Sequence, residues 1–167
     1  ALSRLTAKHA LPSGLLALIL HESESRYRWL KEKVESLVFA KNATPRIAIW
    51  GLSYKKNTDS THNAPSLKVI ADFGKRAALT AYDPAVTLPP GMPVMAAKDR
   101  YAALAGADAL LILSDWDVFK DPDITGITKA MKTPLVIDPL GVLCDRAKDL
   151  AHAGVSYVTM GKSELRE

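Results

Sequence analysis

The chain has 167 residues, 48% hydrophobic and 24% charged, a composition typical of one globular domain with a short extension. Its net charge of +4 suits a phosphorylated small molecule, and no run of five like charges points to a nucleic acid. The longest unbroken apolar run, residues 15–20, is too short to span a membrane, so no membrane association is expected. The single cysteine, Cys144, cannot form an internal disulfide, which favours a reducing, cytoplasmic setting.

The first predicted element is a long amphipathic helix over residues 13–39. Apolar residues recur every three or four positions along it, and a charged belt occupies residues 21–26. Its length would be roughly 40 Å at a rise of about 1.5 Å per residue. The helix is either a connector or dimer face, or it packs only on its own domain. We assign residues 1–40 to this helical region and residues 41–167 to a compact domain.

Apolar strands alternate with helices from residue 46 onward. Strands are predicted over residues 46–52, 78–82, 109–113, 135–137 and 155–159, and helices over 65–76, 99–105, 124–131 and 144–153. Strands that are apolar throughout and alternate with helices are typical of a parallel sheet covered on both faces. The expected fold is therefore an α/β, doubly wound, mainly parallel sheet preceded by a long α-helix.

The main candidate site lies in residues 47–65, where a buried strand opens at Gly51 into a polar loop that leads to a helix. Ligands of open α/β sheets bind beyond the carboxyl ends of the strands, where this loop would lie. Lys55 and Lys56 either attract an anion there or are ordinary solvated lysines. The loop lacks the Gly-x-Gly-x-x-Gly pattern of a standard dinucleotide site.

Polar residues near the ends of the predicted elements supply further candidates. Asp83, Asp115 and Asp138 each follow a predicted strand and would share one edge of the sheet, where they either ring a crevice or hold loops. Asn63 is expected to cap the helix that begins at residue 65. His62 has no zinc-spaced partner, so no metal site is expected.

Residues 47–65 resemble a signature of the C-terminal domain of the UDP-glucose/GDP-mannose dehydrogenases. This signature is an apolar strand followed by Gly-Leu-x-[Phe/Tyr]-Lys-x-[Asn/Asp]-Thr-Asp-Asp-x-Arg-x-[Ala/Ser]-Pro. The matching residues are Gly51, Leu52, Tyr54, Lys55, Asn57, Thr58, Asp59, Ala64 and Pro65. Further matches follow in order at Tyr82-Asp83-Pro84, at Ala107-Asp108-Ala109, and at Asp115-Trp116 with Phe119. Residues 19–38 resemble the end of the family's central dimerisation helix.

This resemblance implies a Rossmann-like domain that binds the nucleotide part of a nucleotide sugar. Family members use two NAD molecules to oxidise the C6 alcohol of a UDP- or GDP-sugar to a carboxylate. Their NAD is bound mainly by a separate N-terminal domain, which also helps to bring the catalytic cysteine. By resemblance, Lys55 reaches the substrate diphosphate, while Tyr54 and the backbone from Gly51 through Leu52 to Ser53 line the site. Asp59, which matches the signature, is a further candidate site residue beside Asp83 and Asp138.

The sequence departs from the family pattern at several positions. An arginine that helps to bind NAD in the family falls on His62, which lacks a permanent charge. Asp138 is followed by Pro139-Leu140-Gly141 instead of the usual arginines. Cys144 lies away from the family's catalytic cysteine and near no base, so the isolated chain is expected to be inactive. We expect a homodimer formed through the N-terminal helix. The expected function is that of a C-terminal fragment of an NAD-dependent nucleotide-sugar dehydrogenase; the alternative is a divergent, non-catalytic nucleotide-binding or dimerisation module.

Overall fold

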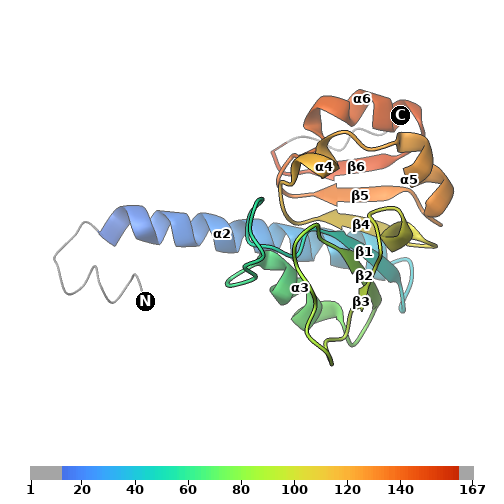
Figure 1. The fold of residues 1–167 in the computed structure, drawn as a ribbon. Helices are drawn as coiled ribbons and strands as arrows, with labels where there is room; N and C mark the ends of the chain where they lie inside the picture. The colour runs from blue at the N-terminus through green and yellow to red at the C-terminus, as the bar shows by residue number, and fades with distance from the viewer. Residues whose placement is uncertain (1–12, 162–167) are drawn as a thin grey trace.

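The computed structural model describes residues 13–161, with side chains from residue 21, and contains a six-stranded parallel sheet (Figure 1). The strands are β1 (Arg46–Trp50), β2 (Ala78–Tyr82), β3 (Met95–Ala96), β4 (Ala109–Ile112), β5 (Leu135–Asp138) and β6 (Ser156–Thr159). Their order across the sheet is β3-β2-β1-β4-β5-β6, and each neighbouring pair is parallel. The chain thus builds one half of the sheet outward from β1 and the other half outward from β4.

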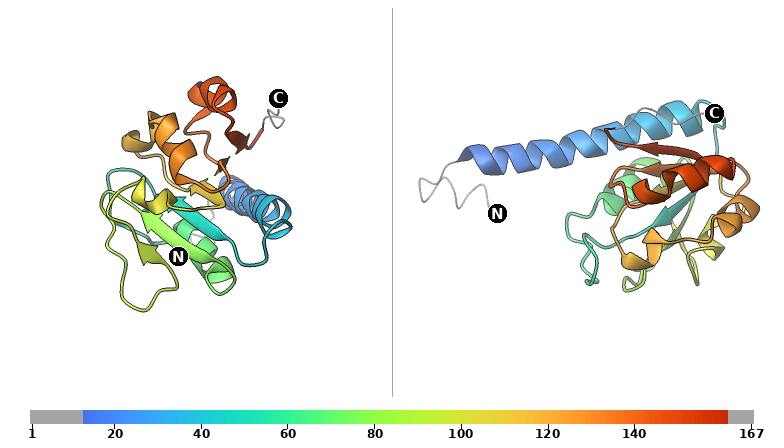
Figure 2. Two further views of the ribbon diagram at one scale, coloured as in Figure 1. Left: turned by 90° about the vertical axis from the view of Figure 1, so that its right-hand side faces the viewer. Right: turned by 90° about the horizontal axis from the view of Figure 1, so that it is seen from above.

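Helices cover both faces of this sheet (Figure 2). They are α2 (Ser13–Val34), the π-helix η1 (Glu35–Phe39), α3 (Pro65–Phe73), α4 (Asp117–Lys120), α5 (Ile124–Ala130) and α6 (Ala147–His152), with 3₁₀ turns η2 (Ala102–Leu104) and η3 (Cys144–Arg146). One face packs against α2, η1 and α3, and the other against η2, α4, α5 and α6. The predicted doubly wound α/β sheet is confirmed.

The alternating side chains of β1 explain why both faces need a covering layer. Ile47 and Ile49 point into the core beneath α2 and α3, whereas Ala48 and Trp50 point into the core beneath η2 and α4 to α6. All four are at most 1% exposed. An apolar strand of this kind has no polar face to offer to water, so it forms only at the centre of a layered sheet.

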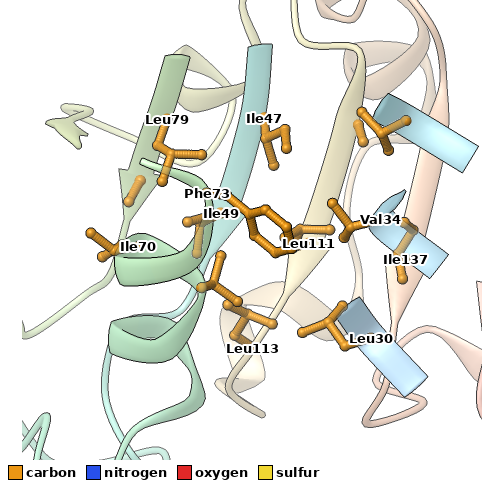
Figure 3. Packing of buried hydrophobic residues seen from close by; sticks show 14 of the residues in the cluster. Leu30, Val34, Ile47, Ile49, Ile70, Phe73, Leu79, Leu111, Leu113 and Ile137 are labelled. Atoms are coloured by element: carbon orange, nitrogen blue, oxygen red, sulfur yellow. The ribbon is translucent and has the colours of Figure 1, made fainter. Parts of the chain in front are cut away.

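The C-terminal half of α2 is part of the domain core. Leu30, Val34 and Val38 are at most 3% exposed, and Figure 3 shows Leu30 and Val34 packed toward Leu111 and Phe73. These three residues are spaced four apart and therefore lie on one face of the helix. Figure 1 shows the N-terminal half of α2 extending beyond the sheet. The helix therefore does pack on its own domain, but along only part of its length.

Polar contacts also join α2 to α3. Asp72 accepts hydrogen bonds from Tyr27 Oη at 3.0 Å and from Lys31 Nζ at 2.7 Å. Burial and the neighbouring Asp72 raise the pKa of Tyr27 above its ordinary value. Arg76, just beyond α3, forms a bidentate pair with Glu35 at 2.6 and 3.0 Å. These contacts join α2 and η1 to α3 and to the turn that follows it.

Several local predictions are wrong. Strand β3 and helix α4 were not predicted, because β3 is two exposed residues long and α4 is a single turn, so neither repeats an apolar pattern. Helix α3 ends at Phe73 rather than at residue 76. Asn63 does not cap α3: the N-cap is Ala64, and Asn63 adopts a left-handed conformation with φ of 59°. Asparagine tolerates that conformation better than most residues, so here it serves the turn before the helix.

No helix within residues 13–161 combines the length and apolarity needed to cross a bilayer.

Candidate functional site

A cleft of about 630 Å³ lies at the carboxyl ends of the strands, between the loops after β1, β4 and β5 and the helix α2. Its lining residues are Glu22, Ser23, Arg26, Tyr27, Leu30, Tyr54, Lys55, Asn63, Pro65, Leu113, Ser114, Asp115, Pro139 and Leu140. The chain leaves β1 toward one edge of the sheet and β4 toward the other. The cleft therefore lies at the topological switch point, where open α/β sheets bind their ligands.

Two cationic side chains face this cleft from different elements. Lys55 comes from the loop after β1, and Arg26 comes from α2. Among residues 21–161, neither forms an ion pair that would neutralise it. The carboxylates of Glu22 and Asp115 also line the cleft. A guanidinium and an ammonium that are free of ion pairs are suited to an anion such as phosphate, and the carboxylates can accept hydrogen bonds from hydroxyl groups.

Several of the residues that line the cleft are apolar. Leu30 contributes from α2, Leu113 from the end of β4, and Pro139 and Leu140 from the loop after β5. The aromatic ring of Tyr54 stands exposed at the same cleft. A pocket with an apolar wall and a few convergent charges fits a ligand that has both a flat apolar ring and charged groups.

Lys56 is tied to the loop after β4. Its ammonium is 3.1 Å from Asp117 Oδ1, and its backbone N–H donates to Asp115 Oδ1 at 3.2 Å. Hydrogen bonds from Lys120 and Lys56 hold the pKa of Asp117 below its ordinary value. Of the two adjacent lysines, Lys56 therefore joins two loops, whereas Lys55 faces the cleft.

Gly51 and Leu52 are buried where the chain leaves β1 and, unlike Tyr54 and Lys55, do not line the cleft. Gly51 has φ of 95°, and a Cβ there would lie 2.0 Å from Ser114 Oγ. Only glycine allows this approach of the β1 loop to the end of β4. Within the described part of the chain, Ser114 Oγ is the one buried side-chain oxygen or nitrogen without a hydrogen-bond partner.

Asp83, at the end of β2, uses both carboxylate oxygens to hold backbone. Oδ2 accepts from Leu52 N at 2.7 Å and from Ser53 N and Oγ at 3.0 Å. Oδ1 accepts from Ala85 N at 2.9 Å and from Val86 N at 3.0 Å. Burial alone would raise the pKa of Asp83, but the backbone N–H donors outweigh it and hold the pKa below its ordinary value.

Asp138, at the end of β5, is fully buried and also holds a loop. It accepts from Leu140 N at 3.1 Å, Leu143 N at 2.9 Å and Tyr157 Oη at 2.8 Å. Burial and the charge of Asp138 raise the pKa of Tyr157 above its ordinary value. Tyr157 Oη is also 3.6 Å from Cys144 Sγ, and this thiol does not line the cleft.

The structure separates the sequence-predicted residues into two groups. Tyr54 and Lys55 line the cleft, and so does Asp115. Asp59 and His62 lie on the exposed loop between β1 and α3 and do not line it. Their binding roles, like those of the cleft residues, stay predictions.

Sequence reasoning missed the contribution of α2 to this cleft. Glu22, Arg26 and Leu30 line one wall and are spaced four residues apart, which places them on one face of the helix. That spacing was visible in the sequence. The position of the helix over the strand ends was not, because it depends on packing between segments distant along the chain.

A parallel sheet in the order 3-2-1-4-5-6, with a ligand-sized cleft at its switch point, is the architecture of Rossmann-like nucleotide-binding domains. The chain also matches the model of the UDP-glucose/GDP-mannose dehydrogenase family, UDP binding domain, over residues 48–145. It therefore belongs to the UDP-glucose/GDP-mannose dehydrogenase family, as the resemblance of residues 47–65 predicts.

Similar sequences include named UDP-glucose 6-dehydrogenases. One from Rhizobium meliloti (strain 1021) is 31% identical over 98% of this chain, and the matched part is 38% of that relative. One from Bacillus subtilis (strain 168) is 36% identical over 71% of this chain and 28% of that relative. The chain thus spans well under half the length of these relatives.

Solved structures of related folds include two from archaea. A UDP-D-ManNAc dehydrogenase from Pyrococcus horikoshii superposes with a TM-score of 0.62 at 25% identity, covering 83% of this chain and 30% of that one. An NDP-N-acetyl-D-galactosaminuronic acid dehydrogenase from Methanosarcina mazei Go1 gives a TM-score of 0.67 at 20% identity, covering 84% of this chain and 29% of that one. The second likeness supports the fold alone.

Proposed function

We propose that this chain is the nucleotide-sugar-binding part of an NAD-dependent nucleotide-sugar 6-dehydrogenase acting in the cytoplasm. The whole enzyme oxidises the C6 alcohol of a UDP- or GDP-sugar to a carboxylate. The observation that carries the proposal is the cleft at the switch point, to which Lys55 and Arg26 bring two cationic groups that form no ion pair among the described residues. Membership of a dehydrogenase family with a UDP binding domain supports it.

The ligand's parts match the two kinds of residue that line the cleft, charged and apolar. The diphosphate carries negative charge and would be bound by Lys55 and Arg26, because charge-assisted hydrogen bonds are the strongest available. The nucleobase is flat and would pack against the apolar residues Leu30, Leu113 and Leu140. The hydroxyl groups of the sugar can donate hydrogen bonds to the carboxylate of Glu22 or Asp115.

The loop after β1 does not fit the pyrophosphate of NAD. Residues 51–64 contain one glycine, Gly51, and this glycine is used for packing against Ser114. A standard dinucleotide loop needs further glycines so that its backbone can approach the pyrophosphate at a helix N-terminus. We therefore assign NAD mainly to parts of the enzyme outside this chain, and His62 is the residue here that we propose to face it.

Binding of nucleoside diphosphates tests the proposal directly. Calorimetric titration of the full chain with UDP, GDP and their sugars should give saturable binding to at least one of them. Lys55→Ala should weaken that binding by about tenfold, because a charge-assisted contact to phosphate is lost. Lys129→Ala removes an exposed lysine of α5 outside the cleft and serves as the matched control. Equal affinities of Lys55→Ala and the parent would contradict the assignment.

The isolated chain should not turn over substrate. The one thiol, Cys144, lies beside Tyr157 and not in the cleft, so the chain offers no cysteine nucleophile there. Mixing the chain with NAD and UDP-glucose and following NADH absorbance tests this expectation. Steady production of NADH would overturn it.

We also propose that the chain forms a homodimer through α2, with residues 1–40 as a dimerisation region and residues 41–167 as the nucleotide-sugar-binding domain. The proposal is supported by the part of α2 that extends beyond the sheet (Figure 1).

A further inference from the structure

Asp83 lies outside the cleft, yet it contacts the chain directly before the cleft residues. Its side chain does not line the cleft. Leu52 and Ser53, whose backbone N–H groups it binds at 2.7 and 3.0 Å, immediately precede Tyr54 and Lys55. Among the strand-end aspartates it is therefore the one that binds the backbone directly before these two residues, whereas Asp115 accepts from Lys56 N directly after them.

The same carboxylate reaches the loop after β4. Trp116 Nε1 donates to Asp83 Oδ2 at 3.2 Å and to Ser53 Oγ at 2.9 Å. Ser53 Oγ in turn donates to Asp83 Oδ2 at 3.0 Å. Trp116 directly follows Asp115, another cleft residue. One buried carboxylate thus connects the ends of β2, β1 and β4, the three strands around the switch point.

The contacts require an acceptor at both oxygens. Oδ2 meets donors from Leu52, Ser53 and Trp116, and Oδ1 meets the backbone N–H groups of Ala85 and Val86. An ionised carboxylate only accepts hydrogen bonds, so it satisfies both sets. An amide of the same size must place its NH₂ group against one of the two sets of donors, whichever way it is turned.

We infer that Asp83 is a positioning residue for nucleotide binding. It sets the backbone from Leu52 to Tyr54 so that Lys55 meets the ligand, and through Trp116 it sets the distance between the two loops that flank the cleft. The inference rests on the proposed function, since it concerns the same cleft. It gives Asp83 a role in affinity without contact to the ligand.

The test compares Asp83 with Asp108. Both carboxylates accept hydrogen bonds from backbone N–H groups, but only Asp83 does so next to cleft residues. Asp83→Asn is the variant. Asp108→Asn is its matched control, because Asp108 accepts from Asn42 Nδ2 at 3.0 Å and Arg46 N at 2.9 Å at the opposite edge of the sheet. Calorimetric titration with UDP, or with GDP if the parent prefers it, is done on full chains well below each unfolding temperature.

We expect Asp83→Asn to weaken nucleotide binding by about tenfold or more, since displacement of a binding group by about 1 Å is costly. Asp108→Asn should bind nucleotide within about twofold of the parent, even if its unfolding temperature falls by as much as that of Asp83→Asn. A carboxylate with a merely structural role would lower the unfolding temperature and leave the affinity unchanged. A loss of affinity in Asp83→Asn that the equally destabilised Asp108→Asn does not show would identify Asp83 as a positioning residue.

A milder variant keeps the test decisive if Asp83→Asn fails to fold. Ser53→Ala leaves the backbone bonds in place and removes only the hydroxyl between Asp83 and Trp116, so we expect an affinity loss of roughly two- to fivefold. Unchanged affinity in both variants, or equal losses in Asp83→Asn and Asp108→Asn, would overturn the inference. If the parent chain binds neither UDP nor GDP, the proposed function itself fails, which is a distinguishable result.

Discussion

At the scale of single residues, Gly51 and Asp83 show how a few atoms set the geometry of the cleft. Gly51 brings the β1 loop against Ser114, and Asp83 then fixes the next two residues through their backbone N–H groups. Gly51 acts because it has no Cβ, and Asp83 acts because both of its carboxylate oxygens accept hydrogen bonds. Substitutions here therefore have large and specific expected effects.

We predict that Gly51→Ala lowers the free energy of unfolding by about 2–4 kcal/mol. The methyl group would collide with Ser114 Oγ, and alanine is strained at φ of 95°. Gly91→Ala is the control, because Gly91 has a similar φ of 86° but open space around its Cβ. Urea unfolding should show a loss of about 1 kcal/mol in the control. Equal losses in the two variants would mean that the contact with Ser114 contributes nothing.

Asp83 should also make stability depend on pH. Its pKa is lower in the folded protein than the ordinary 3.8, so the unfolded chain binds more protons as the pH falls. The stabilisation is thus fully present above the ordinary pKa and is lost as the pH falls through the folded pKa. Urea unfolding between pH 7 and pH 3 should show the parent's advantage over Asp83→Asn shrinking at the acidic end. An advantage that stays constant across this range would contradict the expected linkage.

At the scale of elements, α2 has two parts with different surroundings. Its C-terminal half contributes Leu30 and Val34 to the core and is joined to α3 through Asp72. Its N-terminal half extends past the sheet (Figure 1). The cleft residues Glu22 and Arg26 lie near the middle of α2. The packing of the C-terminal half against the core therefore determines where their side chains are placed.

Val34→Ala should lower the free energy of unfolding by about 2–3 kcal/mol, because Val34 is fully buried between α2 and the sheet. Val118→Ala is the matched control: this valine is 42% exposed, and the expected change is within about 0.5 kcal/mol. Chemical denaturation measures both. A cost for Val34→Ala no larger than for the control would mean that α2 does not stabilise the domain.

At the scale of the whole molecule, the part of α2 that packs on the domain should not be needed for dimerisation. Removal of residues 1–20 deletes the extending part of the helix and retains Tyr27, Leu30 and Val34, which hold the helix to the domain. We expect the shortened chain to sediment as a monomer with an intact far-ultraviolet spectrum, while the full chain sediments as a dimer. Identical sedimentation of the two chains would contradict dimerisation through α2.

Part of this protein could be predicted from the order of its residues. Apolar segments alternating with helical patterns predict a layered parallel sheet, because strands without a polar face must be covered on both sides. The register of matches from Gly51 to Pro65 also indicated the family, which the model of its UDP binding domain confirmed. Local signals failed where elements are short, as in β3, or where a residue serves a turn, as Asn63 does.

The sequence by itself determined the α/β class, the family and the loop that carries Lys55, because these depend on patterns within short segments. Only the tertiary structure decided that α2 closes the cleft with Arg26 and that Lys56 pairs with Asp117. It also decided that Asp83 and Asp138 direct their oxygens to backbone N–H groups. Each of these results depends on contacts between segments far apart in the chain, and the energy of such contacts is set by packing that no local pattern encodes.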